Sequence, residues 1–348
     1  MDYNLNIEKI SLNNEKDIIE VKEFLKGFDL NLDENIDYTV AIRAQDEIKA
    51  TASKSKNVFK CFAIAKDLQG EGIANKLITA LNDKLFEEGV YHSFIFTKPD
   101  NLDLFKDIGY KFIAEGEGVV LLENGMDNIE RYLERIKKKY NIDTNKEHSA
   151  LVMNCNPFTK GHRYLIETAA KNSEQVLVFI VEEDKSLFPF KVRYNLVKEG
   201  VKDLENVTVI PGGEYIISSA TFPTYFLREE SKVLKGFTSL DANIFGKHFC
   251  RGLNIDKRFV GEEPYCNVTR AYNETLEEVL KSYGVKLEII ERKSENGVKI
   301  SASMVRDIIK KKEVEDIRDL VPEVTYNFLK SEGAASIVEK IKKSNSVH

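Results

Sequence analysis

The sequence Asn154-Cys155-Asn156-Pro157-Phe158-Thr159-Lys160-Gly161-His162 follows the short apolar run at residues 151–153 and precedes a helical pattern over residues 163–172. This order predicts a strand, a turn that contains Gly161 and a helix that begins near His162. The first turn of such a helix has backbone N–H groups without intrahelical partners, and these would point, with the imidazole, at a bound phosphate. The stretch therefore indicates a phosphate-binding turn in an α/β fold.

A second motif lies far downstream, at Ile300-Ser301-Ala302-Ser303-Met304-Val305-Arg306, and a helical pattern follows over residues 304–311. The hydroxyl and backbone N–H groups of Ser301 and Ser303 would cradle the terminal phosphates of a nucleotide. Arg306, one helical turn after Ser303, would add a bidentate phosphate contact. In the structural alternative, the serines cap the helix and the arginine forms only a weak surface ion pair.

Strand-like and helical patterns alternate from about residue 145 onward. Helical patterns occur at residues 163–172, 191–203 and 268–283, and strand-like apolar runs occur at residues 151–153, 176–181, 207–210, 258–260 and 287–290. Such alternation predicts a parallel sheet covered by helices.

The composition is that of an ordinary globular protein. The chain has 348 residues, enough for two or three hydrophobic cores, and a net charge of -6, which disfavours broad binding to nucleic acid. The lysine runs at residues 137–139 and 310–312 are more typical of solvated helix faces than of contact points. The N-terminus is charged where a signal peptide would be apolar, and no run reaches membrane-spanning length, so we expect a cytoplasmic protein. The four cysteines, which form no Cys-x-x-Cys pair, are expected to be buried or incidental thiols.

Two domains and a connection are predicted from the positions of turns. The turn signal Glu123-Asn124-Gly125 follows an apolar run at residues 119–122 and predicts the end of a strand and of a first domain, residues 1–125. Apolar residues recur at helical spacing between residues 126 and 140, so residues 126–144 are expected to form a connecting helix and linker. Residues 145–348 would form the second domain.

The first domain contains a glycine-rich turn of its own. A strand candidate at residues 59–64 is followed by Gln69-Gly70-Glu71-Gly72-Ile73-Ala74 and then by a helical pattern. Backbone N–H groups at such a turn can hold a pyrophosphate, and the small residues Gly72 and Ala74 allow a close approach.

This turn resembles the Gln/Arg-x-x-Gly-x-Gly/Ala signature of the GNAT acetyltransferase family, and residues 101–112 resemble that family's later helix-to-strand segment. The resemblance implies that Gln69, Gly70, Gly72 and Ala74 bind the pyrophosphate of a coenzyme-A-like group. Many family members have a tyrosine general acid where this chain has Phe105, which cannot donate a proton. We therefore favour a scaffold or docking role over acetyl transfer, and Tyr110 is the fallback acid.

The two motifs of the second domain resemble the Thr/His-x-Gly-His and Ile-Ser-x-Ser/Thr signatures of the nucleotidyltransferase superfamily. The resemblance implies a Rossmann-like parallel-sheet domain that binds ATP, with His162 and Thr159 as catalytic donors to the phosphates. Nucleotidyl transfer depends on alignment and on neutralising charge, so no protein nucleophile is required. The expected ATP-binding residues are Asn156, Phe158, Thr159, Gly161, His162, Gly261, Glu262, Ser301, Ser303 and Arg306.

Gly261-Glu262-Glu263-Pro264 lies at a predicted strand end, where open α/β sheets bind ligands. Its carboxylates could contact a ribose or a metal-bound water, or they could cap a turn. Charge alone leaves these alternatives open, and only the resemblance to a known family favours the first.

Taken together, the GNAT-like domain, the Asn154–His162 stretch, Gly261-Glu262-Glu263-Pro264 and the Ile300–Arg306 motif closely resemble the citrate (pro-3S)-lyase ligase family over nearly the whole chain. The resemblance implies activation of acetate by ATP as acetyl-adenylate. The acetyl group would then pass to the thiol of a coenzyme-A-like prosthetic group on the citrate lyase acyl carrier subunit, with release of AMP and diphosphate. Such chemistry would use Mg²⁺ on the phosphates, and no protein metal ligand is identified. The partners are thus ATP, acetate and the carrier subunit, without nucleic acid or membrane.

Two other enzyme classes share parts of this pattern. Small-molecule adenylyltransferases of the phosphopantetheine or nicotinamide mononucleotide type share both phosphate motifs, but the added N-terminal domain argues against them. A GNAT acetyltransferase with a nucleotide-sensing second domain is disfavoured by Phe105. The sequence does not distinguish acetate from other small carboxylates.

Overall fold

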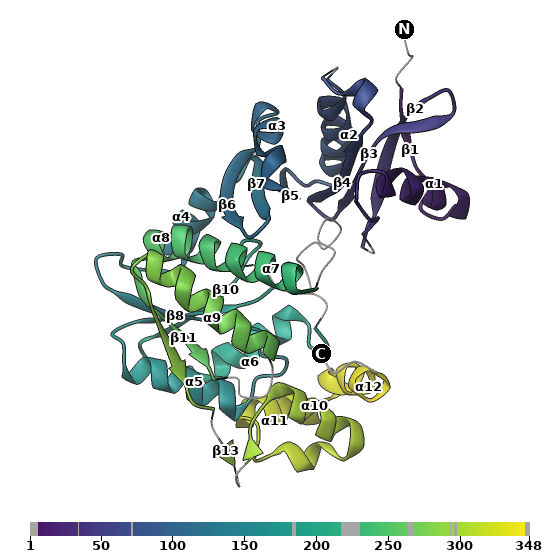
Figure 1. Ribbon diagram of the computed structural model, residues 1–348. Coiled ribbons are helices and arrows are strands. Elements are labelled where there is room, and N and C mark those ends of the chain that lie inside the picture. The colour runs from purple at the N-terminus through teal and green to yellow at the C-terminus, as the bar shows by residue number, and fades with distance from the viewer. Residues whose placement is uncertain are drawn as a thin grey trace. The chain divides into compact units, whose positions relative to one another are not determined.

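The computed structural model describes residues 6–33, 35–70, 72–182, 186–216, 230–262, 267–292, 294–295 and 298–344 (Figure 1). The chain divides into two compact units. Unit 1 comprises residues 1–132 with 222–240, and unit 2 comprises residues 133–221 with 241–348. The domain boundaries at residues 125 and 145 stay predictions.

Unit 1 is built on a sheet of order β1-β2-β3-β4-β5-β7-β6. Neighbouring strands are antiparallel except for β4 and β5, which pair in parallel through Val58↔Phe94 and Phe59↔Ile95. No further β4–β5 pair is formed among the described residues, so these strands part towards their carboxyl ends. The elements are β1 (Ile7–Lys9), α1 (Glu15–Lys26), β2 (Tyr38–Ala44), β3 (Glu47–Ser55), β4 (Val58–Ile64), η1 (Lys66–Leu68), α2 (Ile73–Glu87), β5 (His92–Thr97), η2 (Pro99–Asn101), α3 (Leu102–Asp107), β6 (Lys111–Gly116) and β7 (Val119–Gly125).

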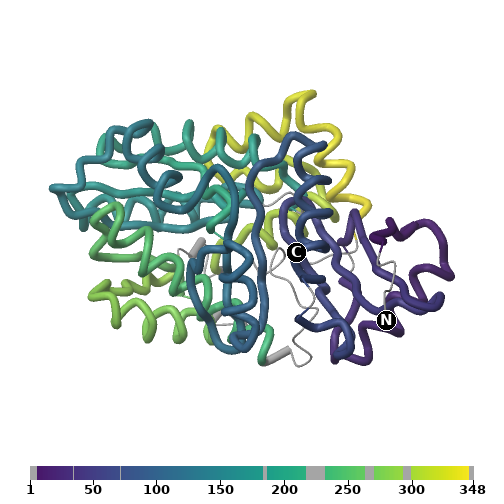
Figure 2. The backbone as a smooth tube through the Cα atoms, turned by 90° about the horizontal axis from the view of Figure 1, so that it is seen from above, coloured from purple at the N-terminus to yellow at the C-terminus, as the bar shows by residue number. Residues whose placement is uncertain are grey.

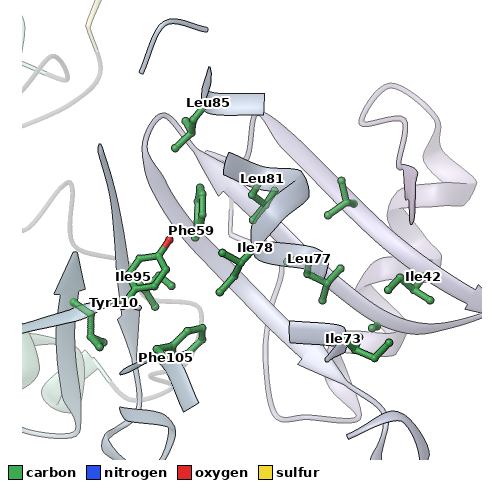
Figure 3. Close-up of a cluster of buried hydrophobic side chains, with 14 of the residues drawn as sticks. Ile42, Phe59, Ile73, Leu77, Ile78, Leu81, Leu85, Ile95, Phe105 and Tyr110 are labelled. Carbon is green, nitrogen blue, oxygen red and sulfur yellow. The ribbon is translucent and has the colours of Figure 1, made fainter. Parts of the chain in front are cut away.

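The core of unit 1 lies between this sheet and α2 (Figure 3). The apolar face of α2 places Leu77 and Leu81 fully inside, against strand residues such as Ile42 and Phe59. Phe105 from α3 closes one end of the same cluster. This packing fixes the start of α2, and with it the glycine-rich turn that comes before it.

The expected turn at residues 123–125 is wrong, because β7 continues through Gly125, which pairs with His92. Gly125 has a φ of 145°, and a Cβ there would clash with the carbonyl oxygen of Tyr91. The glycine therefore allows a close approach of two strands rather than a chain reversal.

Unit 2 contains a fully parallel sheet of order β10-β9-β8-β11-β12. The predicted strands and the helices between them are confirmed, with small shifts at their ends. The elements are α4 (Ile129–Tyr140, which begins in unit 1), β8 (His148–Met153), α5 (Lys160–Lys171), β9 (Val176–Ile180), α6 (Phe190–Gly200), β10 (Val207–Pro211), α7 (Glu230–Ile244, whose first part belongs to unit 1), the π-helix η3 (Phe245–Cys250), α8 (Arg251–Leu253), β11 (Ile255–Gly261), α9 (Asn267–Ser282) and β12 (Lys286–Ile290).

The chain ends in a helical group with its own apolar cluster, which includes Ile300, Val305 and Ile337. Figure 2 shows this segment in yellow. Its elements are β13 (Ser294–Glu295), β14 (Val298–Lys299), α10 (Ala302–Lys311), η4 (Val314–Ile317), α11 (Glu323–Lys330), η5 (Glu332–Ala334) and α12 (Ala335–Lys343).

The predicted fold class is confirmed: a mixed α/β unit of GNAT-like strand order comes before a Rossmann-like parallel sheet. Within the described residues, no helix is long and apolar enough to cross a membrane. Cys61, Cys155 and Cys250 are buried, as expected, and Cys266 lies outside the described residues.

Candidate active site

The predicted phosphate-binding turn follows the central strand β8, and Glu262 follows the neighbouring strand β11. The strands of the sheet are added in opposite directions from these two: β9 and β10 lie beyond β8, and β12 lies beyond β11. Open α/β sheets bind ligands in the crevice at such a switch point, beyond the carboxyl ends of the strands. The fold thus brings both segments to the edge where a ligand is expected.

Thr159 is the N-cap of α5 and holds His162 in a reciprocal capping box. The backbone N–H of His162 donates to the Thr159 hydroxyl (3.3 Å), and the backbone N–H of Thr159 donates to Nδ1 of His162 (3.1 Å). A backbone N–H can only donate, so Nδ1 is an acceptor and the neutral ring carries its proton on Nε2. The Thr159 hydroxyl lies 3.0 Å from the same Nδ1. Thr159 therefore fixes both the tautomer and the orientation of the imidazole.

Burial and the nearby charge of Arg292 lower the pKa of His162 from its ordinary value of 6.5 to about 4. The ring is therefore neutral near pH 7, with one N–H to donate. Arg292 lies just after β12, and its Nε donates to the backbone oxygen of Glu262 (2.8 Å). Sequence reasoning missed Arg292. The available signal was its place two residues after the predicted strand at residues 287–290, at the edge of the sheet where ligands bind.

The first turn of α5 offers fewer free N–H groups than expected. Thr159 N donates to the imidazole and His162 N to the Thr159 hydroxyl, while Lys160 N donates to the carbonyl oxygen of Leu320 (2.9 Å). Among the described residues, only the N–H of Gly161 in this first turn has no hydrogen-bond partner. The helix therefore presents one backbone N–H and the imidazole Nε2–H.

Gly161 is where the two motifs meet. A Cβ on Gly161 would lie 2.9 Å from the carbonyl oxygen of Ile300, the residue that begins the second motif. That distance is shorter than real Cβ atoms tolerate, so a glycine lets α5 pack against this backbone. The turn that contains His162 and the segment that leads into Ser301 thus lie in contact, although Gly161 and Ile300 are 139 positions apart in sequence.

Ser301 caps α10, as the structural alternative predicted, because its Oγ accepts from the backbone N–H of Met304 (3.1 Å). The first intrahelical bond runs from Val305 N to Ser301 O (3.2 Å). The N–H groups of Ala302 and Ser303 therefore remain at the N-terminus of the helix, where the dipole favours negative charge. The phosphate role of Ser301 and Ser303 stays a prediction.

Arg306 is not the exposed helical arginine that the sequence allowed; only 7% of its surface is accessible. Its Nη1 donates to the carbonyl oxygen of Asn156 (2.5 Å), and its Nη2 donates to Ser303 Oγ (3.2 Å). Asn156 is also held through its side chain, whose Oδ1 accepts from the backbone N–H of Phe188 (3.0 Å). Arg306 thus links the two motifs through protein acceptors, and its predicted phosphate contact remains untested.

Arg193, which sequence reasoning also missed, anchors the other end of the turn. It is fully buried in α6 and donates to the carbonyl oxygens of Phe188 (2.9 Å), Asn154 (2.7 Å) and Val181 (2.8 Å). A helical arginine gives no sequence signal of burial. The carbonyl groups of Asn154 and Asn156 are therefore each held by a buried guanidinium.

Phe158 was expected to bind ATP, but it is fully buried in the core of unit 2. Its ring lies nearly parallel to that of His162, at 16° and 6.3 Å between centroids. On another side it packs against Gly200, where a Cβ would lie 2.5 Å from Phe158 Cε1. Phe158 therefore belongs to the core and packs against the imidazole of His162.

Glu262 pairs with Lys299, the residue before Ile300, at 2.8 Å between Oε2 and Nζ. Its backbone N–H donates to Ile290 O (2.8 Å), and the carbonyl of Gly261 accepts from Asn273 Nδ2 (3.4 Å). The carboxylate thus draws the second motif towards the end of β11. Glu263 and Pro264 lie outside the described residues.

The glycine-rich turn of unit 1 borders a cavity of about 520 Å³. Gly70 and Gly72 have φ values of 86° and 71°, and a Cβ at either position would meet no atom within 4 Å. Gln69, Gly70, Gly72 and Ala74 all line the cavity, as do Phe105 and the diverging ends of β4 and β5. This size lies within the range of small-molecule sites.

Tyr110, the fallback acid, does not line this cavity. It is 3% exposed, its hydroxyl lies 2.8 Å from Ser93 Oγ, and burial raises its pKa well above the ordinary value. The structure argues against proton donation by Tyr110 at the cavity.

In the described part of the chain, no group of three or more His, Cys, Asp or Glu side chains is arranged to hold a metal ion.

Comparison with known proteins gives a consistent family. Residues 148–329 match the model of the citrate lyase ligase C-terminal domain. The chain is 36% identical over 329 residues to the citrate (pro-3S)-lyase ligase of Escherichia coli K12, covering 93% of each chain. It is 37% identical over 336 residues to the enzyme of that name from Haemophilus influenzae, covering 94% of this chain and 99% of the relative.

Two solved structures are similar to parts of the chain, with lower sequence identities than these relatives. A protein from Vibrio parahaemolyticus assigned as a nicotinate-nucleotide adenylyltransferase is 14% identical, with a TM-score of 0.34, and covers 58% of this chain and 99% of its own. An aminoglycoside 6'-N-acetyltransferase complexed with coenzyme A is 9% identical, with a TM-score of 0.31, and covers 36% and 98%. The fold rests on the strand orders above, and the family on the relatives of similar length. The chain belongs to the citrate (pro-3S)-lyase ligase family.

Proposed function

We propose that this chain is an ATP-dependent acid-thiol ligase. It activates acetate as acetyl-adenylate and transfers the acetyl group to the prosthetic-group thiol of the citrate lyase acyl carrier subunit, with release of AMP and diphosphate. The observation that carries the proposal is the contact between Gly161 and Ile300, which joins the two phosphate motifs at the switch point of the sheet. The relatives named citrate (pro-3S)-lyase ligase, aligned over nearly the whole chain, support it.

In the first step, an acetate oxygen attacks the α-phosphorus of ATP, and the bond to the bridging oxygen of the β-phosphate breaks. Negative charge develops on the departing diphosphate and must be neutralised by fixed donors. His162 donates from Nε2, because Nδ1 is occupied by Thr159. The N-terminus of α10 adds the N–H groups of Ala302 and Ser303. Thr159 acts in this scheme as a positioning residue.

In the second step, the thiol sulfur attacks the carbonyl carbon of acetyl-adenylate. A C–S bond forms, the C–O bond to the phosphate breaks, and AMP leaves with that oxygen while the thiol proton is lost to solvent. The cavity of unit 1 is suited to the coenzyme-A-like group that bears the thiol. Its glycine turn can approach a pyrophosphate closely, and the parted strands leave room for an extended arm.

Mg²⁺ belongs to this proposal as a partner of the substrate phosphates. Mg²⁺ is often bound mainly by substrate phosphates and water, and the proposal assigns it no protein ligand. When bound, it would neutralise part of the triphosphate charge.

The test is isotope exchange between ATP and diphosphate, measured with and without acetate. We expect exchange that requires acetate and does not require the carrier, because adenylation is complete before the thiol enters. Exchange that ignores acetate would exclude the ligase mechanism. An adenylated phosphate product in place of AMP would identify a small-molecule adenylyltransferase instead.

A further inference from the structure

Two lysine groups that are separate in sequence come together at the C-terminal helices. α10 ends at Lys311, α12 ends at Lys343, and these helices pack against each other (Figure 1). Lys310 Nζ donates to the carbonyl oxygen of Ser344, directly after α12, which ties the two helix ends together. The C-terminal lysine patch is defined as Lys310, Lys311, Lys312, Lys340, Lys342 and Lys343, all of which are exposed.

Each lysine group alone has an ordinary explanation, because cations at the end of a helix complement its dipole. The helix dipole does not explain why the two groups come together at one place. Lys343 pairs with Glu339 (2.5 Å), but in the described parts of the chain no acid pairs with Lys311, Lys312 or Lys342. Like charges that are gathered without partners repel, and the chain as a whole carries a net charge of -6. The patch therefore gathers six exposed cations on a protein whose net charge is negative.

The position of the patch follows from α10. The helix begins at its N-cap Ser301, in the candidate active site, and runs for 10 residues to Lys311. At a rise of about 1.5 Å per residue, the patch lies about 15 Å from that N-terminus. A thiol carried on an arm needs its carrier protein to dock at a distance from the reacting atoms. The helix thus connects the site to a charged surface at a suitable separation.

We propose that the C-terminal lysine patch docks the carrier subunit through an acidic surface of that subunit. This inference rests on the proposed function, because only a protein-borne thiol requires a docking surface. Complementary charge raises association rates by about ten- to a thousandfold and loses its effect as salt increases. Adenylation of acetate needs no carrier and is independent of the patch.

The test compares Lys311→Glu/Lys312→Glu with Lys138→Glu/Lys139→Glu. Both double variants place acids at exposed positions at the C-terminal end of a helix, α10 or α4, and both change the net charge by the same amount. We expect the first to raise the KM for the carrier at least about tenfold at low salt. The salt dependence should flatten, while kcat and acetate-dependent exchange stay unchanged. The control should match the wild type in every measurement.

Equal KM values for the two double variants would overturn the docking proposal. Lys342→Glu, on the neighbouring helix α12, gives a second test if the first variant folds poorly, and it should raise the same KM. Failure of the proposed function has a different signature, since wild-type protein would then show no acetate-dependent exchange. If Lys311→Glu/Lys312→Glu keeps acetate-dependent exchange and also keeps the wild-type KM for the carrier, the docking proposal is wrong but the proposed function stands.

Discussion

The carbonyl oxygen of Ile300 lies 2.9 Å from the point where a Cβ on Gly161 would stand. This close approach packs the turn after β8 against the start of α10, and the bond from Arg306 to the carbonyl oxygen of Asn156 links the same two segments. In the proposed function, both segments lie at the switch point of the sheet, and His162 and the N-terminus of α10 donate to one triphosphate. The proposed adenylation step depends on this geometry.

Gly161→Ala should therefore separate the two motifs. The added methyl group meets backbone, which cannot move aside as a flexible side chain can, so we expect a destabilisation of about 1–3 kcal/mol and a loss of ATP–diphosphate exchange. Thermal unfolding and exchange assays measure the two effects. Gly333→Ala is the matched control, since a Cβ there meets only Ser331 Oγ at 3.6 Å. Full exchange in Gly161→Ala would show that the contact is dispensable.

Substitutions of His162 can separate its capping role from its donor role. Asparagine retains an acceptor near the position of Nδ1 but has no donor at Nε2, whereas glutamine can bring an amide N–H to that position. We expect His162→Asn to keep nearly normal stability and to lose exchange at least about a hundredfold, in line with the loss of one transition-state donor. His162→Gln should retain part of the activity. Equal activity of the two variants would contradict donation from Nε2.

The lowered pKa of His162 also predicts how stability depends on pH. The imidazole is neutral in the folded protein down to pH about 4, but in the unfolded chain it binds a proton near pH 6.5. Its contribution to stability is therefore complete above pH 6.5 and is lost as the pH falls towards 4. Chemical denaturation from pH 7.5 to 4.5 should show a shallower decline for His162→Asn than for the wild type. Parallel curves would mean that the folded pKa is not lowered.

Gly72→Val tests the cavity of unit 1. A β-branched residue at a φ of 71° is strained and would alter the turn that borders the cavity. We expect weaker acetylation of the carrier with unchanged acetate-dependent exchange. Gly89→Val, at a similar φ of 74° in the same unit but away from the cavity, controls for strain alone. Loss of both activities in Gly72→Val would count against a separate site for the prosthetic group.

The sequence was sufficient for the fold because its strong signals are local. Alternating strands and helices predicted the parallel sheet, and the short motifs around His162 and Ser301 predicted the two helix starts. The turn expected at Gly125 was wrong, because a glycine that permits close strand approach has the same local signal as one in a turn.

The contacts that support the site could not be found this way. Arg193 was missed because its acceptors are backbone carbonyl groups, whose positions cannot be read from a sequence. Arg306 was predicted as a phosphate contact, but its buried bond to the carbonyl oxygen of Asn156 was not predicted. The C-terminal lysine patch likewise exists only once α10 and α12 pack together. Residues that touch a motif from a distant element need the tertiary structure to be recognised.

The most direct test of the proposed adenylation follows an oxygen atom. Acetate labelled with ¹⁸O in both carboxylate oxygens should be incubated with ATP, the carrier subunit and the wild-type protein, and the products analysed by mass spectrometry. We expect one labelled oxygen in the phosphate of AMP and none in diphosphate, because the attacking acetate oxygen stays on phosphorus when the C–O bond breaks. AMP without label, or label in the diphosphate, would contradict the acetyl-adenylate intermediate.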